Sequence, residues 1–237
     1  MRLNQTSLSL IASLLCTPLW GGMVANAAPL PTETRLTQAS VQSLLNQGIQ
    51  QYNDGNYQQA VTHFSDAIDQ NADQAKAFYY RGISYLELGK QQKAIQDYTR
   101  VIELKPKNAQ AYYERGIAYT QQGNYQNAIA DYDRALELEL EKASVYLNRG
   151  IAHSQQGNYQ KALSDYTQAI ELNDEMAGAY ANRGVTRASL GKQESAIADL
   201  EKAAELYQKQ GNQQRYQVVQ QRLQQLQQRS NSSDSGI

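Results

Sequence analysis

Apolar side chains recur in residues 109–142 at the spacing of two amphipathic helices. In the second half of this segment, Tyr125, Ala128, Ile129 and Tyr132 follow the i, i+3, i+4, i+7 pattern, which places them on one face of a helix. The first half carries a shorter pattern of the same kind. Gly123 separates the halves, and glycine ends a helix readily because it adopts the left-handed backbone conformation without a Cβ clash. The segment therefore predicts a helix, a tight turn and a second, antiparallel helix.

Three series of small residues repeat along the chain with a constant step of 34 residues. They are Gly48, Gly82, Gly116, Gly150 and Gly184; Gly55, Gly89, Gly123, Gly157 and Gly191; and Ala60, Ala94, Ala128, Ala162 and Ala196. A constant period of this size is typical of repeat architectures. We predict five consecutive helical pairs, at residues 41–74, 75–108, 109–142, 143–176 and 177–210.

The glycine inside the first helix of each unit predicts close helix packing. Gly116 costs about 1 kcal/mol of helix stability relative to alanine, and each of the five units has a glycine at this place. We therefore expect the second helix to approach closely here, with Ala128 as the small residue that faces Gly116.

These landmarks resemble the tetratricopeptide repeat (TPR) family. The residues of the third unit that match the TPR pattern are Tyr112, Gly116, Tyr119, Gly123, Tyr125, Ala128, Tyr132 and Ala135. The resemblance covers residues 41–210 and implies an all-α fold, a right-handed α-solenoid of five TPR helix-turn-helix units. It departs from the family at the closing proline, which only Pro106 supplies. Because no helix breaker occurs in residues 138–141, we expect one helix to run on toward the fourth unit.

The flanks carry different patterns. Arg2, the apolar run 8–15 and the small residues 25–27 predict a signal peptide at residues 1–27. An uncleaved anchor and a lipoprotein modified at Cys16 are the alternatives, although residues 13–15 fit a lipobox poorly. Residues 28–40 are expected to form a polar linker.

A glutamine-rich segment follows the repeats. Its single apolar stripe predicts a capping helix at residues 211–229, since a solenoid needs a terminal element with a polar outer face. A coiled-coil dimer helix is the alternative. Residues 230–237 are expected to be a disordered tail.

Composition argues against several functions. The chain has 22 basic and 23 acidic residues, a balance that disfavours a nucleic-acid partner. Cys16 is the only cysteine, and the only histidines, His63 and His153, lie in different units. We find no phosphate loop, nucleophile elbow or histidine-containing triad. We therefore predict a protein that is not an enzyme, without catalytic residues, metal site or cofactor.

Arginine and aspartate occur together at two fixed places. Arginine directly precedes the helix-internal glycine in the last four units, and aspartate follows 16 residues later: Arg81 and Asp97, Arg115 and Asp131, Arg149 and Asp165, Arg183 and Asp199. The first unit has Gln47 and His63 instead. Because an antiparallel hairpin brings both places to the same height, we predict an Arg–Asp bridge within each of these units. A ligand contact is the alternative role.

The TPR resemblance also implies a concave surface lined by the first helices, with ligand-facing places 2, 5, 6, 9, 12 and 13 of each unit. The residues expected to bind a partner there are Tyr52, Lys76, Tyr79, Ile83, Leu86, Tyr113, Ile117, Leu147 and Ile151. Aliphatic residues at place 9 argue against the carboxylate clamp of some TPR domains, which needs asparagine. Such an apolar groove suits an extended or helical segment of another protein. Packing between neighbouring first helices is the alternative role of these residues.

Together these features predict a non-catalytic protein-binding scaffold, adaptor or assembly factor, with a protein segment as its partner and no stable membrane span after signal cleavage. The alternative is a structural protein that assembles with its own copies through the groove or the C-terminal helix. The units are similar to small exported bacterial TPR proteins, cyanobacterial ones among them. That similarity implies the periplasm, the thylakoid lumen or the extracellular space.

Overall fold

The computed structural model describes residues 32–234, and every regular element in this range is an α-helix. The helices are α1 (Thr32–Asn53), α2 (Tyr57–Gln70), α3 (Ala75–Glu87), α4 (Gln91–Leu104), α5 (Ala109–Gln121), α6 (Tyr125–Glu137), α7 (Ala143–Gln155), α8 (Tyr159–Leu172), α9 (Ala177–Ser189), α10 (Gln193–Lys209) and α11 (Gln213–Asp234).

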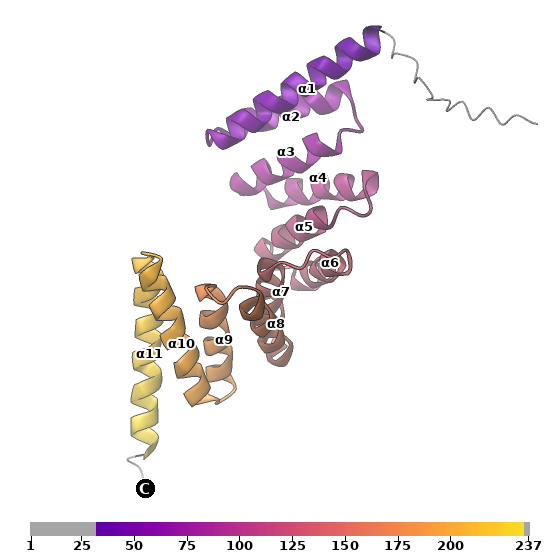
Figure 1. Cartoon of the computed structure of the whole chain (residues 1–237). Coiled ribbons are helices and arrows are strands. Elements are labelled where there is room, and N and C mark those ends of the chain that lie inside the picture. The colour runs from indigo at the N-terminus through magenta and orange to yellow at the C-terminus, as the bar shows by residue number, and fades with distance from the viewer. Residues whose placement is uncertain (1–31, 235–237) are drawn as a thin grey trace, which may run out of the picture.

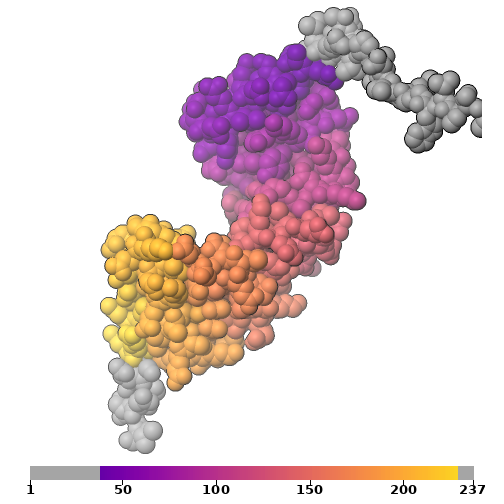
Figure 2. All heavy atoms as spheres, viewed as in Figure 1, coloured from indigo at the N-terminus to yellow at the C-terminus, as the bar shows by residue number. Residues whose placement is uncertain are grey.

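Consecutive helices pack as antiparallel pairs, and each predicted unit is one pair, from α1–α2 to α9–α10. The pairs stack into a curved array in which α3 and α5 lie on one side and α4 and α6 on the other (Figure 1). A hollow separates the N-terminal and C-terminal ends on one side of the molecule (Figure 2). The prediction of an all-α solenoid of helix pairs is confirmed.

The core between the helices combines large aromatic side chains with alanines. Tyr98, Tyr132 and Tyr166 hold the same place in successive units and are almost completely buried, beside alanines such as Ala128 that have no exposed surface. An alanine Cβ lets a neighbouring helix come close enough for the tyrosine ring to fill the space between them. The repeated glycine and alanine places are thus requirements of packing.

Gly116 shows what the helix-internal glycine does. A Cβ at this position would lie 2.6 Å from Cε1 of the Tyr132 ring, which is too close for a methyl group. The three nearest atoms all belong to the ring of Tyr132, which packs against the bare backbone and therefore requires glycine here. In the fifth unit, the backbone carbonyl of Ala196, which is equivalent to Ala128, also lies 3.0 Å from the Cβ position of Gly184.

Two turns show how the helices end. Gly123 has φ of +75° between α5 and α6, as the sequence predicts. The expected extension of a helix through residues 138–141 is wrong, because α6 ends at Glu137. Glu139 has φ of +63°, and the amide of Leu140 donates to the carbonyl of Ala135 at 3.0 Å. A glutamate here adopts the backbone conformation that glycine supplies in the turn within each unit.

The flanking helices are longer than predicted. Helix α1 begins at Thr32, inside the expected linker 28–40, and α11 continues to Asp234, inside the expected tail 230–237. Neither additional segment contains a proline or glycine that would end a helix. The expected signal peptide at residues 1–27 lies outside the described residues.

The Arg–Asp bridges are present in all four units that were expected to have them. In the third unit, Nε and Nη2 of Arg115 donate to the two carboxylate oxygens of Asp131, both at 2.8 Å. Both side chains are largely buried. The corresponding pairs are Arg81–Asp97, Arg149–Asp165 and Arg183–Asp199. Each pair ties the two helices of its unit together with a bidentate, charge-assisted contact.

The third guanidinium nitrogen reaches the preceding unit. Nη1 of Arg115 donates to Oγ1 of Thr99 on α4 at 3.0 Å. The acceptors for the other three arginines are Ser65, Asp133 and Thr167, at the same place in their units. One arginine therefore joins three helices, two in its own unit and one in the unit before it.

Candidate protein-binding groove

The first helices place the predicted partner-binding residues along one side of the array. None of the nine is fully buried, and Lys76 is exposed. Ile83 and Leu86 pack against the core of the second unit, Ile117 against that of the third, and Leu147 against that of the fourth and fifth. The aliphatic members thus contribute to packing between first helices and retain some exposed surface.

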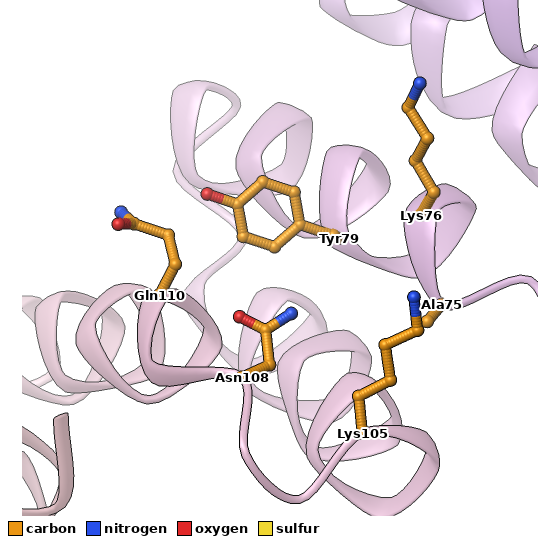
Figure 3. A pocket seen from close by; sticks show the side chains of 6 residues that line it. All are labelled: Ala75, Lys76, Tyr79, Lys105, Asn108 and Gln110. Atoms are coloured by element: carbon orange, nitrogen blue, oxygen red, sulfur yellow. The ribbon is translucent and has the colours of Figure 1, made fainter. Parts of the chain in front are cut away.

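Lys76 and Tyr79 come together in a cavity of about 370 Å³ where the N-terminal ends of α3 and α5 meet. Its other lining residues are Ala75, Lys105, Asn108 and Gln110. The hydroxyl of Tyr79 points toward Gln110, and the side chain of Lys105 reaches toward Ala75 (Figure 3). Tyr52, Tyr113, Ile151 and the other predicted residues do not line this cavity.

The charge around the cavity is positive. Neither Lys76 nor Lys105 forms an ion pair with a described residue. The N-termini of α3 and α5 lie at this cavity, and the N-terminus of a helix carries a partial positive charge. Asn108 caps α5 by accepting a hydrogen bond from the amide of Ala111 at 3.1 Å. The cavity can therefore receive an acidic group beside the flat ring of Tyr79.

A hydrogen-bonded network lies deeper in the groove. Nε2 of Gln110 donates to Oε1 of Glu114 at 2.8 Å, and the hydroxyl of Tyr79 also bonds to this carboxyl group. Burial raises the pKa of Glu114, and these two hydrogen bonds oppose that rise. The network places a buried carboxyl group beside the Tyr79 hydroxyl at the edge of the cavity.

Tyr113 occupies the equivalent place in the next unit. Its hydroxyl accepts a hydrogen bond from Nδ2 of Asn148 at 3.1 Å, and burial raises its pKa. In both units the tyrosine at place 5 therefore bonds to the residue at place 6 of the following unit. This arrangement gives the aromatic side chains of the groove a defined geometry before any partner arrives.

Four residues of this region, Lys105, Asn108, Gln110 and Glu114, are not among the nine predicted from the sequence. Gln110 and Glu114 lie at places 2 and 6, which the family resemblance had marked as ligand-facing, so a signal for them was present. Lys105 and Asn108 belong to the turn between units. Nothing in the helical period indicates that their side chains reach the cavity.

In the described part of the chain, no group of three or more His, Cys, Asp or Glu side chains could hold a metal ion. Between residues 32 and 234, no helix has both the length and the apolar composition of a membrane span.

Comparison with family models gives four matches along the chain. A model described as "TPR repeat" matches residues 84–123, and models described as "Tetratricopeptide repeat" match residues 42–73, 108–175 and 147–211. These matches span most of the predicted array, and no enzyme family is among them. No curated protein is significantly similar in sequence to this chain.

Several solved structures have the same fold. MamA is 23% identical with a TM-score of 0.65, covering 70% of this chain and 96% of that one. A MamA fragment from Desulfovibrio magneticus RS-1 is 19% identical with a TM-score of 0.69, covering 72% and 97%. YrrB, described as a TPR protein with an unusual peptide-binding site, is 20% identical with a TM-score of 0.63, covering 74% and 92%. At these identities the likeness establishes the fold alone.

Proposed function

Because the chain belongs to the tetratricopeptide repeat family, we propose that it is a non-catalytic scaffold or assembly factor that binds a segment of another protein in its groove. The observation that carries the proposal is the cavity at α3 and α5. It combines the aromatic ring of Tyr79 with two lysines that form no ion pair within the described residues. An extended segment with an acidic group and a neighbouring apolar side chain would fit both features. The peptide-binding site of YrrB, a structure of the same fold, supports this reading.

Charge reversal tests the proposal without disturbing the core. Lys76 and Lys105 are both exposed, so the double variant Lys76→Glu/Lys105→Glu is expected to fold normally. The matched control is Lys161→Glu/Lys192→Glu, which changes the same charge at exposed positions outside this cavity. Each protein is immobilised and used to capture partners from extracts of the source cells. We expect a partner that the wild type and the control retain and the Lys76/Lys105 variant loses.

The aromatic contribution needs a separate variant. Tyr79→Ala/Tyr113→Ala removes both place-5 rings of the groove and is checked for folding by circular dichroism. A partner that binds this variant as well as the wild type would contradict binding in the groove. If each bait captures only copies of itself, the protein is a self-assembling scaffold, and sedimentation velocity at several concentrations would measure that assembly.

Export is part of the same proposal and rests on the sequence. The pattern of Arg2, the apolar run 8–15 and the small residues 25–27 supports cleavage after Ala27. N-terminal sequencing of the protein from the source cells should then begin at Ala28. A mature chain that begins at Met1 and is recovered from the cytosol would contradict export to the periplasm, the thylakoid lumen or the medium.

A further inference from the structure

The joint between the third and fourth units, where α6 meets α7, departs from the pattern of the other joints. Its connecting residues 138–142 include Glu139 with φ of +63°, and no residue in the other described connections between units, at 71–74, 105–108 and 173–176, has a positive φ. A side chain makes this backbone conformation strained. The joint lies near the middle of the array (Figure 1), so a change of angle there would move its two halves relative to each other.

A buried histidine occupies the same joint. His153 on α7 is only 7% exposed, and its Nδ1 atom is buried without a hydrogen-bond partner among residues 32–234. The second and third units have Tyr85 and Tyr119 at this place. Tyr119 packs on the core of its own unit and on that of the unit before it. His153 therefore holds a place at which consecutive units meet.

Four charged groups face His153 from three helices. They are Arg149 on α7, Asp133 on α6, and Lys161 and Asp165 on α8. Nη1 of Arg149 donates to Oδ1 of Asp133 at 2.7 Å. Nε and Nη2 of Arg149 donate to the two oxygens of Asp165 at 3.0 and 2.6 Å. Both carboxylates are thus already bonded to a cation while the histidine ring is neutral.

The fifth unit shows how a second cation is accommodated at this place. Arg187 corresponds to His153, and its Nη1 donates to Oδ2 of Asp199 at 2.7 Å. Asp199 corresponds to Asp165. An imidazole is shorter than an arginine side chain, and Nδ1 of His153 makes no such bond. A protonated His153 would therefore reach the carboxylate of Asp165 only if α7 moved.

The contact between units is the weaker of the two that Arg149 makes. The side chain of Asp165 is 6% exposed and accepts two hydrogen bonds, whereas that of Asp133 is 49% exposed and accepts one. Solvent and salt screen an exposed ion pair more than a buried one. A movement of α7 would thus break its contact with α6 before its contact with α8.

We propose that the joint between the third and fourth units is an acid-sensitive hinge, which is closed while His153 is neutral and loosens when His153 takes up a proton. The added charge is buried beside Arg149 without an acceptor, and a buried charge without a partner is unfavourable. Movement of α7 away from α6 gives the ring access to water. The three units before the joint and the two after it then change their relative angle, which alters the curvature of the array.

The direction of the pH effect follows from the surroundings of the histidine. Burial lowers the pKa of His153, and Lys161 and Arg149 add to this effect, whereas Asp165 and Asp133 oppose it. A histidine in an unfolded chain titrates near pH 6.5. Below that pH the unfolded chain binds the proton more strongly than the folded chain, so the free energy of unfolding decreases as the pH falls. The hinge is therefore closed at pH 7.5 and weakens below about pH 6.5.

Hydrogen exchange of the full chain at pH 7.5 and pH 5.5 locates the effect. After correction for the intrinsic exchange rates, we expect protection at pH 5.5 to decrease in α6 and α7 and to remain in α3 and α4. His153→Tyr, which has the residue of the second and third units, should lose this pH dependence. His63→Gln is the matched control, because it removes the only other histidine, and it should behave like the wild type.

A titration of the histidine ring tests the charge cluster directly. His63→Gln leaves one histidine, so its single imidazole signal in the NMR spectrum belongs to His153. We expect the midpoint to lie below pH 6.5. Asp133→Thr in this background should shift the midpoint to lower pH, because one of the two carboxylates that favour the charged ring is lost.

Three results would overturn the proposal. They are a titration midpoint of His153 at or above pH 6.5, an equal loss of protection in α3–α4 and α6–α7, and the same loss in His153→Tyr as in the wild type. The titration needs no variant of His153, so it decides the question even where His153→Tyr does not fold. None of these measurements uses a partner, so the hinge is tested separately from binding in the groove.

Discussion

The first and third helix pairs differ in how their helices are joined. In the third pair, Arg115 bonds to Asp131 of its own unit and to Thr99 of the unit before it. In the first pair, Gln47 bonds only within its own helix, to Ser43, and Nδ1 of His63 is buried without a hydrogen-bond partner among the described residues. No helix pair precedes the first unit in the described array. An arginine there would therefore have no acceptor for its third nitrogen.

This difference identifies the arginine as a link between units as well as within one. Four arginines repeat the same three contacts from the second unit to the fifth, and the array lacks them where no earlier unit exists. The stability of a solenoid is a sum of terms within units and between neighbours. Each Arg–Asp pair contributes to both, so its removal should affect two units.

Removing Arg115 should have the largest effect on stability. Arg115→Ala leaves the carboxylate of Asp131 buried without its partner, which costs about 3–5 kcal/mol of the free energy of unfolding. The control Gln47→Ala at the same place of the first unit should cost less than about 0.5 kcal/mol, because that side chain is exposed. Urea denaturation measures both. Equal effects of the two variants would show that the bridge adds nothing to the third unit.

Removing the hydrogen bond between Arg115 and Thr99, which joins two units, should reduce the free energy of unfolding by a smaller amount. Thr99→Val keeps the shape of the side chain but removes the oxygen that accepts from Arg115, and we expect a loss of about 1–2 kcal/mol. Thr62→Val is the control, because Thr62 is exposed and bonds only to the carbonyl of Gln58 in its own helix. A double-mutant cycle between Thr99 and Arg115 isolates the pair. A coupling energy of zero would mean that Arg115 stabilises only its own unit.

At the buried aromatic place of the units, two equivalent substitutions should change the free energy of unfolding in opposite directions. The first unit has Phe64 where the next two have Tyr98 and Tyr132. The hydroxyl of Tyr132 bonds to Thr120 at 3.0 Å, whereas that of Tyr98 is buried with no partner among the described residues. Tyr98→Phe should therefore raise the free energy of unfolding by about 1 kcal/mol, and Tyr132→Phe should lower it by a similar amount. Thermal and urea unfolding of both variants check the two signs. A loss of stability in Tyr98→Phe would mean that its hydroxyl has a partner in solution.

The ends of the two units also differ. The second helix of the first unit ends at Gln70 and is followed by Asn71 in an extended conformation, whereas the third unit places Glu139 at positive φ. Glu139→Gly should raise the free energy of unfolding by about 0.5–1 kcal/mol, because glycine adopts this conformation without strain. Ala130→Gly, at an exposed place inside α6, should lower it by about 1 kcal/mol. If both substitutions destabilise the protein, the backbone strain at Glu139 is not present in solution.

The sequence predicted those features that lie within one period. The helix pairs, the turn glycines and the Arg–Asp pairs all repeat every 34 residues, so their partners could be inferred from position alone. The acceptor of the third arginine nitrogen could not be inferred from position alone. Its residue type changes from unit to unit: Ser65, Thr99, Asp133 and Thr167. The end of α6 could not be predicted, because a glutamate side chain gives no indication that Glu139 has a positive φ.

The residues of the cavity at α3 and α5 also differ in how far the sequence predicts them. Lys76 and Tyr79 occupy places that repeat in each unit and could be predicted, whereas Lys105 and Asn108 reach the cavity from a turn between units and could not.

The contact between Arg115 and Thr99 has a consequence for arrays of other lengths. Deleting residues 109–142 as a block would bring α7 against α4, where Arg149 would meet Thr99 in place of Asp133. The acceptor would change from a carboxylate to a hydroxyl, and the junction would remain hydrogen-bonded. A copy of the first unit inserted between two later units would offer no arginine to the helix before it. The contact between units is therefore kept when one unit from the second to the fourth is removed or repeated, whereas the first unit can serve only as the beginning of the array.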